Sequence, residues 1–275
     1  MSNALLTLQH TGLYAIFELR RLWLTRSGLM TLAATAVIWG LLLYYLVLPA
    51  TELVSSLASM NTNIRVMGSN ILQHLGNWPS SELTLYWLLS LFLLPIFCLF
   101  FTANQLCSDL ERGTLRFLSL RSSRTAILLG RFAGQMLVQG SLILLTLTAT
   151  LAISAWNAGS FTLPMLNGAA VIWVNLLLIL LPFTALMSVF SALAPTAKLA
   201  VTLAIVSIGV GYGLLSWFTS TYPGWAFLHH YLLGAQVGKI ATVQGWQTLQ
   251  FATLPLLQSL VLLLLAYAIV RRRAL

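Results

Sequence analysis

Residues 132–197 read FAGQMLVQGSLILLTLTATLAISAWNAGSFTLPMLNGAAVIWVNLLLILLPFTALMSVFSALAPTA, without one Asp, Glu, Lys or Arg. A membrane-spanning helix needs about 20 predominantly apolar residues, so this stretch is long enough for two. Residues 156–160 with Pro164 are the part of it that is typical of a turn. Because lipid cannot satisfy free backbone groups, both spans are expected to be helices. The stretch therefore predicts a helical hairpin that crosses a membrane twice.

The rest of the 275-residue chain is equally poor in charge. Hydrophobic residues make up 59% of it and charged residues 7%, against roughly 25% charged in soluble domains, which excludes an ordinary soluble protein. Uncharged stretches predict six spans, at about 28–48, 83–107, 132–155, 169–193, 199–218 and 249–270. We therefore expect an all-α polytopic membrane protein in which residues 1–275 form a single transmembrane domain.

The net charge of +9 comes from 14 basic and 5 acidic residues. Basic residues near the ends of spans mark the cytoplasmic side, and all but Arg65 and Lys239 fall on one predicted side. We expect a multi-pass protein of the cell inner membrane with both termini cytoplasmic, whose basic excess reflects orientation and not nucleic-acid binding. The residues on the basic side are Arg20, Arg21, Arg26, Arg112, Arg116, Arg121, Arg124, Arg131, Lys198, Arg271, Arg272 and Arg273.

The segment before the first span has a two-sided pattern. Residues 1–27 place leucine, isoleucine, phenylalanine and tryptophan on one broad sector of a helix and His10, Glu18, Arg21 and Thr25 on another. This pattern predicts an interfacial helix that lies on the membrane and leads into the first span. A poorly ordered tail is the alternative interpretation.

The last outer loop, residues 219–248, is rich in aromatic side chains. Tyr222, Trp225 and Trp246 are among them, and Pro223-Gly224 interrupts the segment. Tryptophan is enriched where a membrane meets water, and the uncharged part of the loop is too short for a further span. We expect an outer re-entrant or surface hairpin.

The loop between the second and third predicted spans, residues 108–121, reads SDLERGTLRFLSLR. Ser108 and Glu111 have the spacing of a capping box, in which the hydroxyl and the carboxylate satisfy free amides at a helix start. The following leucines and Phe117 give the segment an apolar side, and Ser122-Ser123 separate it from the next helix. A short capped helix is predicted, with a solvated connector as the alternative.

The stretch 109–132 also resembles the segment after the second span of ABC-2 type transporter permeases. Members of that family typically show an acidic and a basic residue, Gly-Thr-Leu, two leucines, Ser-Arg, an aliphatic pair and Gly-Lys. The chain departs from the pattern at Arg116, where an acidic residue is common, and at Leu120-Arg121, where a proline is common. The matching positions are Glu111, Arg112, Gly113-Thr114-Leu115, Leu118, Ser123-Arg124, Ile127-Leu128 and Gly130-Arg131.

The resemblance implies the permease subunit of an ATP-driven exporter. It implies pairing with a second permease, identical or similar, and with two copies of an ATP-binding subunit that hold ATP and Mg. The chain itself has no phosphate-loop motif, and we expect neither catalysis nor a metal in it. Residues 108–121 would form a coupling helix whose contacts with the ATP-binding subunit come from Asp109, Glu111, Arg112, Gly113, Thr114, Arg116 and Arg121.

The cargo is open at this point. A path without charges fits a lipid-like or other amphipathic substrate, and the outer aromatic residues fit a glycan. Uncharged polar residues inside spans either line such a path or form hydrogen bonds between helices. The residues in question are Asn104, Gln105, Gln135, Gln139, Asn175 and Gln258.

Three other functions remain as alternatives. The chain could transmit ATP-driven movement to a periplasmic partner without transport. An intramembrane serine protease could use Ser207 with His229-His230, although the histidines fall in a predicted outer loop. An ion-coupled transporter is disfavoured because such proteins place charged groups inside their spans, whereas the predicted spans contain none.

Overall fold

The computed structural model describes residues 3–47, 49, 80–242 and 245–272. Within these ranges the regular structure is helical and contains no strand. Six of the described helices are long and apolar enough to cross a membrane, which confirms the predicted all-α polytopic membrane fold. They are α2 (Arg26–Leu42), α5 (Ser81–Phe101), α8 (Arg124–Ala158), α9 (Leu163–Leu193), α10 (Ala197–Thr221) and α12 (Thr253–Arg272).

Several helices begin or end away from the predicted span limits. Helix α8 starts at Arg124 instead of residue 132, because the Ser123 hydroxyl accepts a hydrogen bond from the Ala126 amide and caps the helix. Helix α5 starts at Ser81, capped in the same way by Ser80, and ends at Phe101 instead of residue 107. Local caps, and not the nearest charge, therefore set these ends.

Two helices that are long and apolar enough to cross a membrane also contain buried charged residues. Glu82 lies in the first turn of α5 and Arg131 in the third turn of α8, and both side chains are buried. Both residues lie next to the predicted spans, 83–107 and 132–155, which themselves contain no charged residue. A charged group inside a spanning helix is costly and commonly has a function, which directs attention to the ends of α5 and α8.

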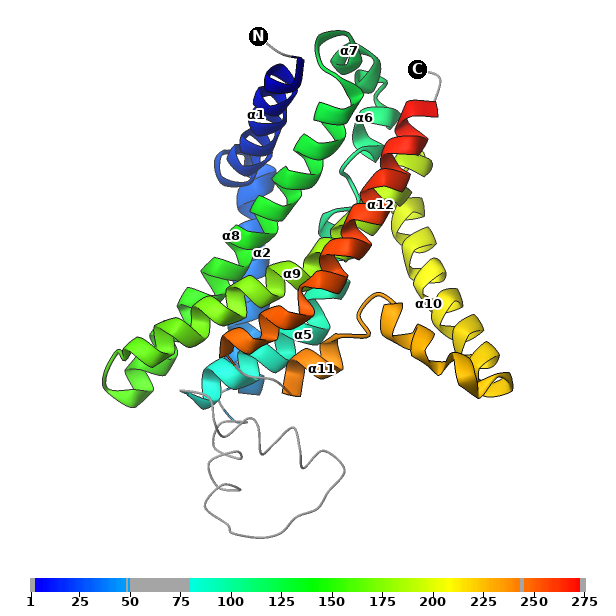
Figure 1. The fold of residues 1–275 in the computed structure, drawn as a ribbon. Helices are drawn as coiled ribbons and strands as arrows, with labels where there is room; N and C mark the ends of the chain where they lie inside the picture. Colours follow the sequence, from blue (N-terminus) through cyan, green and yellow to red (C-terminus); the bar gives the residue numbers. More distant parts are fainter. Residues whose placement is uncertain (1–2, 48, 50–79, 243–244, 273–275) are drawn as a thin grey trace.

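Helix α9 is the central element of the bundle. It packs against α5, α8, α10 and α12, and its buried face contributes Ile172, Leu176 and Met187 to the main apolar core. Helix α10 buries little more than Ala200 and Ala204 and leans away from the bundle along most of its length (Figure 1). The fold is thus a packed core of α5, α8 and α9 with less buried helices around it.

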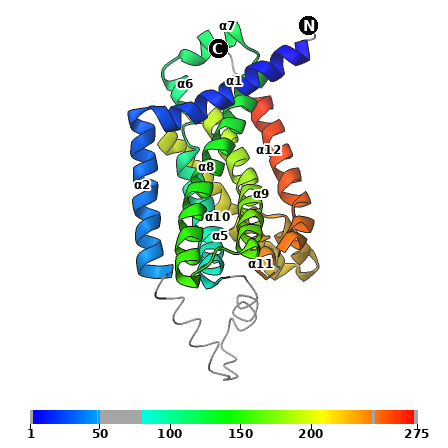
Figure 2. The same ribbon diagram turned by 90° about the vertical axis from the view of Figure 1, so that its left-hand side faces the viewer.

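The helices that are not counted among the six spans lie at the two ends of the bundle (Figures 1 and 2). Helices α1 (Asn3–Leu24), α6 (Cys107–Glu111) and α7 (Thr114–Arg121) lie at the end that also holds both chain termini. Helix α1 crosses that end at a steep angle to α2 (Figure 2). Helix α11 (Val237–Thr242) and the turn between α8 and α9 lie at the opposite end.

The segment predicted as an outer hairpin, 219–248, is built from several short helical elements. Helix α10 extends to Thr221, and the chain then forms the 3-10 helix η2 (Pro223–Tyr231), α11 and the start of a second 3-10 helix, η3 (Gly245–Phe251). Residues 243–244 lie outside the described part of the chain. The segment consists of short turns of helix, and its insertion into a membrane stays a prediction.

Candidate functional site

The segment 107–121, predicted as one helix over 108–121, is two helices. Gly113 has a φ of 67°, the left-handed conformation that glycine adopts most easily, and it separates α6 from α7. The Ser108 hydroxyl donates to the Asn104 carbonyl oxygen (3.2 Å) and so does not cap a helix together with Glu111. The predicted capping box is therefore wrong, because α6 already starts at Cys107.

The predicted partner contacts divide into exposed and internal groups. Glu111, Arg112 and Gly113 are exposed. Asp109 is buried, and the half-buried Thr114 hydroxyl bonds to its carboxylate (3.2 Å). The Asp109 carboxylate points into the chain toward Arg131, so its contact with a partner stays a prediction that this geometry does not favour. The side chains of Arg116 and Arg121 lie outside the described part of the structure.

Helix α7 has apolar residues on both its inner and outer faces. Leu118 packs onto a small core formed with Leu106 and Ile127. Phe117 is 70% exposed and Leu120 is 81% exposed. We call the exposed group of Glu111, Arg112, Phe117 and Leu120 the α7 patch. Exposed apolar residues rimmed by charge are typical of a protein-interaction surface.

Behind the α7 patch lies a buried cluster of three charges. The Arg131 guanidinium of α8 pairs with the Glu18 carboxylate of α1 through one nitrogen and with Asp109 Oδ2 of α6 through the other (2.6 Å). All three residues are buried. Burial raises the pKa of the Asp109 carboxyl, and the hydrogen bond from Thr114 opposes that rise. One arginine thus joins three separate helices.

The ion cluster lies where α1 and α8 approach most closely. A Cβ atom added at Gly130 would lie 2.6 Å from Tyr14 Cβ, and one added at Gly134 would lie 2.8 Å from Glu18 Cβ. Two glycines four residues apart give one helix face on which a second helix can lie at close range. The absence of side chains at Gly130 and Gly134 therefore permits the Glu18–Arg131 contact.

Helix α1 turns Glu18 inward, whereas Arg21 of the same predicted polar sector is exposed. Its predicted apolar sector is exposed, with Leu13 and Phe17 at the surface, whereas Ala15, Glu18 and Leu22 are buried. A helix with an exposed apolar face and a buried carboxylate suits a membrane surface better than water. The structure thus gives Glu18 a specific partner, which the two-sided sequence pattern did not indicate.

A further arginine links α8 to the end of the last helix. Arg124 donates from Nη1 to the carbonyl oxygens of Val270 and Arg271, each at 3.1 Å. A cation at a helix C-terminus satisfies carbonyls that have no partner within the helix and complements the helix dipole. Helix α8 therefore contacts α1, α6 and the end of α12 within its first three turns.

Three of the predicted path residues take part in hydrogen bonds that involve α9. Gln139 and Gln105 bond to side chains of α9, and Asn175 is itself a residue of α9. The Gln139 amide donates to Thr184 Oγ1 (3.1 Å), and the Ser188 hydroxyl donates to Gln105 Oε1 (2.6 Å). The Asn175 amide donates to a threonine hydroxyl of η3 (2.6 Å). These bonds favour the interpretation that such residues hold helices together.

The other three predicted path residues lie apart from this network. The Gln258 amide donates to the Tyr231 carbonyl oxygen (2.8 Å), Gln135 is half-buried and Asn104 is exposed. The structure does not gather the six around one channel. Of the six, Gln139 borders the cavity between α2, α5 and α8.

The residues proposed for a serine protease are separated in the structure. The Ser207 hydroxyl donates to the Ala204 carbonyl oxygen (2.8 Å), and His229 shares a hydrogen bond with Thr219 (2.9 Å). Ser207 and Thr219 are twelve residues apart on α10, or about 18 Å along the helix axis. A nucleophile and its base need direct hydrogen-bond contact, so the described geometry does not support this function.

Sequence reasoning missed the ion cluster and the glycine pair. The sequence indicates Arg131 only as a topology signal and as a position of the family pattern, and Glu18 only as part of a polar sector. Two signals were present in the sequence: the Gly130–Gly134 spacing, and an arginine between those glycines in a stretch that continues as an apolar helix.

The break between α6 and α7 gives a direct prediction. Gly113→Ala is expected to lower stability by about 1–2 kcal/mol, because an alanine disfavours the left-handed conformation. Crowding is not the cause, since nothing lies within 4 Å of an added Cβ. Gly113→Asn should cost less, because asparagine visits this conformation more readily. Thermal unfolding of the purified chain measures the stability of both variants. The control is Gly12→Ala, at a helical position where an added Cβ also has nothing within 4 Å. Equal effects at Gly113 and Gly12 would contradict the strain argument.

Comparison with known proteins assigns the chain. A family model described as ABC-2 family transporter protein matches residues 15–223, a range that includes α2, α5, α6, α7, α8, α9, α10 and the α1 segment around Glu18. A search of curated proteins found no match. The matched range covers well over half of the 275 residues and the whole ion cluster. The chain therefore belongs to the ABC-2 transporter family, whose membrane subunits work with ATP-binding subunits.

Proposed function

We propose that this chain is the permease subunit of an ATP-driven exporter in the cell inner membrane, with both termini cytoplasmic. Family membership supports a role in transport and a partnership with an ATP-binding subunit. Two copies of that subunit would bind ATP and Mg and act on a pair of permeases, identical or similar. The distribution of basic residues supports the orientation, since α1, α6, α7 and the C-terminus share one end of the bundle (Figure 1).

The α7 patch is the observation that carries the proposal. Phe117 and Leu120 are exposed at that end of the molecule, and so are Glu111 and Arg112. Helix α7 rests on the core through Leu118, while α6 is tied to α1 and α8 through Arg131. A force applied to the α7 patch by an ATP-binding subunit would thus reach α1 and the membrane-spanning helix α8.

The cargo we propose is amphipathic, either lipid-like or a glycan-bearing amphiphile. The membrane helices expose mainly leucine, isoleucine, phenylalanine and valine, and the described outer segments expose aromatic residues such as Trp225 and Trp246. Aromatic rings at this position suit a membrane interface and suit molecules with an apolar and a polar part.

The double variant Phe117→Ser/Leu120→Ser tests this function. Removing two exposed apolar anchors should weaken binding of the ATP-binding subunit about 100-fold, since a few large side chains dominate such interfaces. Co-purification and the ATPase rate of the reconstituted complex are the measurements. The matched control is Leu163→Ser, an equally exposed leucine at the start of α9 on the opposite end.

The outcomes separate the hypotheses. Loss of the ATP-binding subunit in the double variant alone supports the proposal, and unchanged binding contradicts the α7 patch as the docking surface. Cargo movement into inverted vesicles by the unmodified complex supports export. Coupled ATP hydrolysis without cargo movement would instead indicate force transmission to a periplasmic partner.

A further inference from the structure

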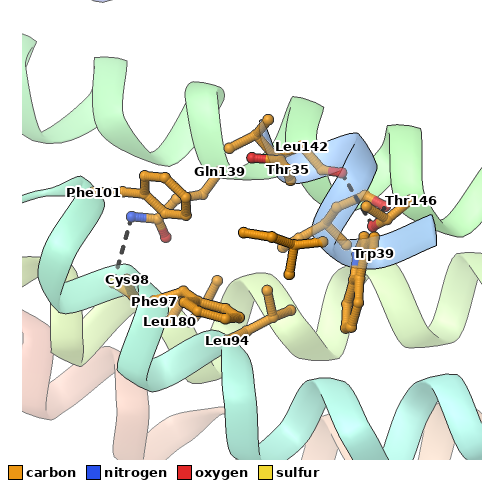
Figure 3. Close-up of a pocket in the computed structure, with 12 residues that line it drawn as sticks. Thr35, Trp39, Leu94, Phe97, Cys98, Phe101, Gln139, Leu142, Thr146 and Leu180 are labelled. Atoms are coloured by element: carbon orange, nitrogen blue, oxygen red, sulfur yellow. Dashed lines mark hydrogen bonds between the residues drawn. The ribbon is translucent and has the colours of Figure 1, made fainter. Parts of the chain in front are cut away.

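A cavity of about 90 Å³ lies between the membrane-spanning helices α2, α5 and α8, with Leu180 of α9 also in its wall (Figure 3). Thr35 and Trp39 of α2, Leu94 and Phe97 of α5, and Leu142 and Ile143 of α8 are among its walls. We call it the α2–α5 pocket. It is separate from the ion cluster and the α7 patch, and the proposed coupling route makes no use of it.

The pocket offers little to a polar ligand. Its Thr35 hydroxyl donates to the Thr31 carbonyl oxygen (2.8 Å), the Gln139 amide is bonded to Thr184, and the Thr146 hydroxyl is bonded to Tyr86 (2.9 Å). A buried water needs two to four polar partners. Since these wall groups already have partners within the chain, an apolar occupant fits the pocket better than water or an ion.

The wall of the pocket reaches the outer surface of the bundle between α2 and α5. Ile38 of α2 and Phe101 of α5 both line the pocket, and they are 47% and 38% exposed. Helix α2 packs on α8 and meets α5 mainly through its terminal turn η1 (Leu43–Val47). The pocket therefore opens sideways, toward the hydrocarbon that surrounds spanning helices.

We propose that the α2–α5 pocket binds the end of a hydrocarbon chain that enters sideways from the bilayer. Apolar transfer from water is not the driving force in lipid. The favourable free energy of binding comes instead from dispersion contacts between the chain end and the pocket walls. The walls of an empty pocket lack these contacts. An apolar cavity of about 150 Å³ admits a benzene molecule, so a pocket of about 90 Å³ holds only the last few carbons. This binding needs no ATP and does not depend on the proposed export function.

Photolabelling tests the pocket. The full chain would be placed in phosphatidylcholine vesicles that contain a phospholipid with a diazirine at one chain end, illuminated, digested and examined by mass spectrometry. Adducts should concentrate on pocket residues of α2, α5 and α8. Thr35→Phe should reduce them about tenfold by filling the space, and Leu94→Trp should do so from the opposite wall. Val37→Phe, on the exposed side of the same helix, should leave them unchanged.

Each result decides the proposal. The proposal is overturned if adducts are spread in proportion to surface exposure, or if neither pocket-filling variant reduces them. The two substitutions are on different helices, so a folding defect in one variant does not decide the test. Repeating the labelling with the ATP-binding subunit and ATP identifies the source of the chain. Loss of adducts during turnover would identify the bound chain as part of the cargo, and persistence of the adducts would identify it as part of a resident lipid. Both results support a hydrocarbon-binding pocket.

Discussion

Gly134→Ala is expected to destabilise the protein although alanine is the better helix former. An added Cβ would lie 2.8 Å from Glu18 Cβ, 2.9 Å from Glu18 Cγ and 3.3 Å from Ala15 Cα. Those atoms belong to the backbone or lie next to it, so relief requires α1 as a whole to move. Overpacking of this kind costs about 1–3 kcal/mol, which corresponds to a fall in Tm of roughly 2–12 °C for a chain of this size.

Gly140→Ala on the same helix is the matched control. Its added Cβ would be 3.5 Å from Leu177 Cδ2, an ordinary contact with the end of a flexible side chain. Because alanine gains up to about 1 kcal/mol of helix propensity over glycine, this variant should be neutral or more stable. Thermal unfolding of both variants in the same lipid provides the comparison. Equal Tm values would show that α1 does not rest on α8 as described.

Gly134→Leu extends the same test to the position of α1. The larger side chain should displace α1 further and separate Glu18 from Arg131, so protease cleavage after Arg20 and Arg21 should accelerate. A leucine at Gly140 meets the flexible Leu177 and Trp173 side chains and should leave that cleavage rate unchanged. The cleavage rate thus reports on α1 separately from global stability.

The spanning helices were largely predictable because their signal is local. A run such as 132–197 needs no partner to be recognised, since its length and lack of charge match the thickness of a membrane. The helix ends were less predictable, because a charged residue at the edge of an uncharged stretch does not mark the end of a helix. Arg124 and Arg131 both continue α8, one bonded to the end of α12 and the other to Glu18 and Asp109.

The ion cluster was not predictable for a different reason. Glu18 and Arg131 are more than a hundred residues apart, and neither periodicity nor a tally of charges says which acid meets which base. The family pattern placed Asp109 and Arg131 on one segment but assigned Asp109 outward. The path of α1 across the end of the bundle (Figure 2) brings Glu18 to Arg131, and the same arginine holds the Asp109 carboxylate inward.

Arg131→Met is expected to have the largest effect of any single substitution considered. It leaves the Glu18 and Asp109 carboxylates buried beside each other without their shared cation. Removing one member of a buried ion pair costs about 3–5 kcal/mol, or roughly 6–20 °C in Tm. Arg112→Met is the control, because Arg112 is exposed and a surface change of this kind stays within about 0.5 kcal/mol.

Replacing the whole cluster distinguishes stability from coupling. The triple variant Glu18→Gln/Asp109→Asn/Arg131→Met contains no buried charge at this site and should regain most of the lost stability, since well-packed neutral groups commonly replace a buried ion pair at little cost. It should not regain coupling, because the guanidinium that joins α6 to α1 and α8 is gone. Cargo-stimulated ATPase activity of the reconstituted complex should therefore stay low while Tm recovers. Recovery of both would mean that Arg131 only stabilises the fold and that movement of α6 reaches the membrane helices by another route, such as the contact of Leu118 with the core.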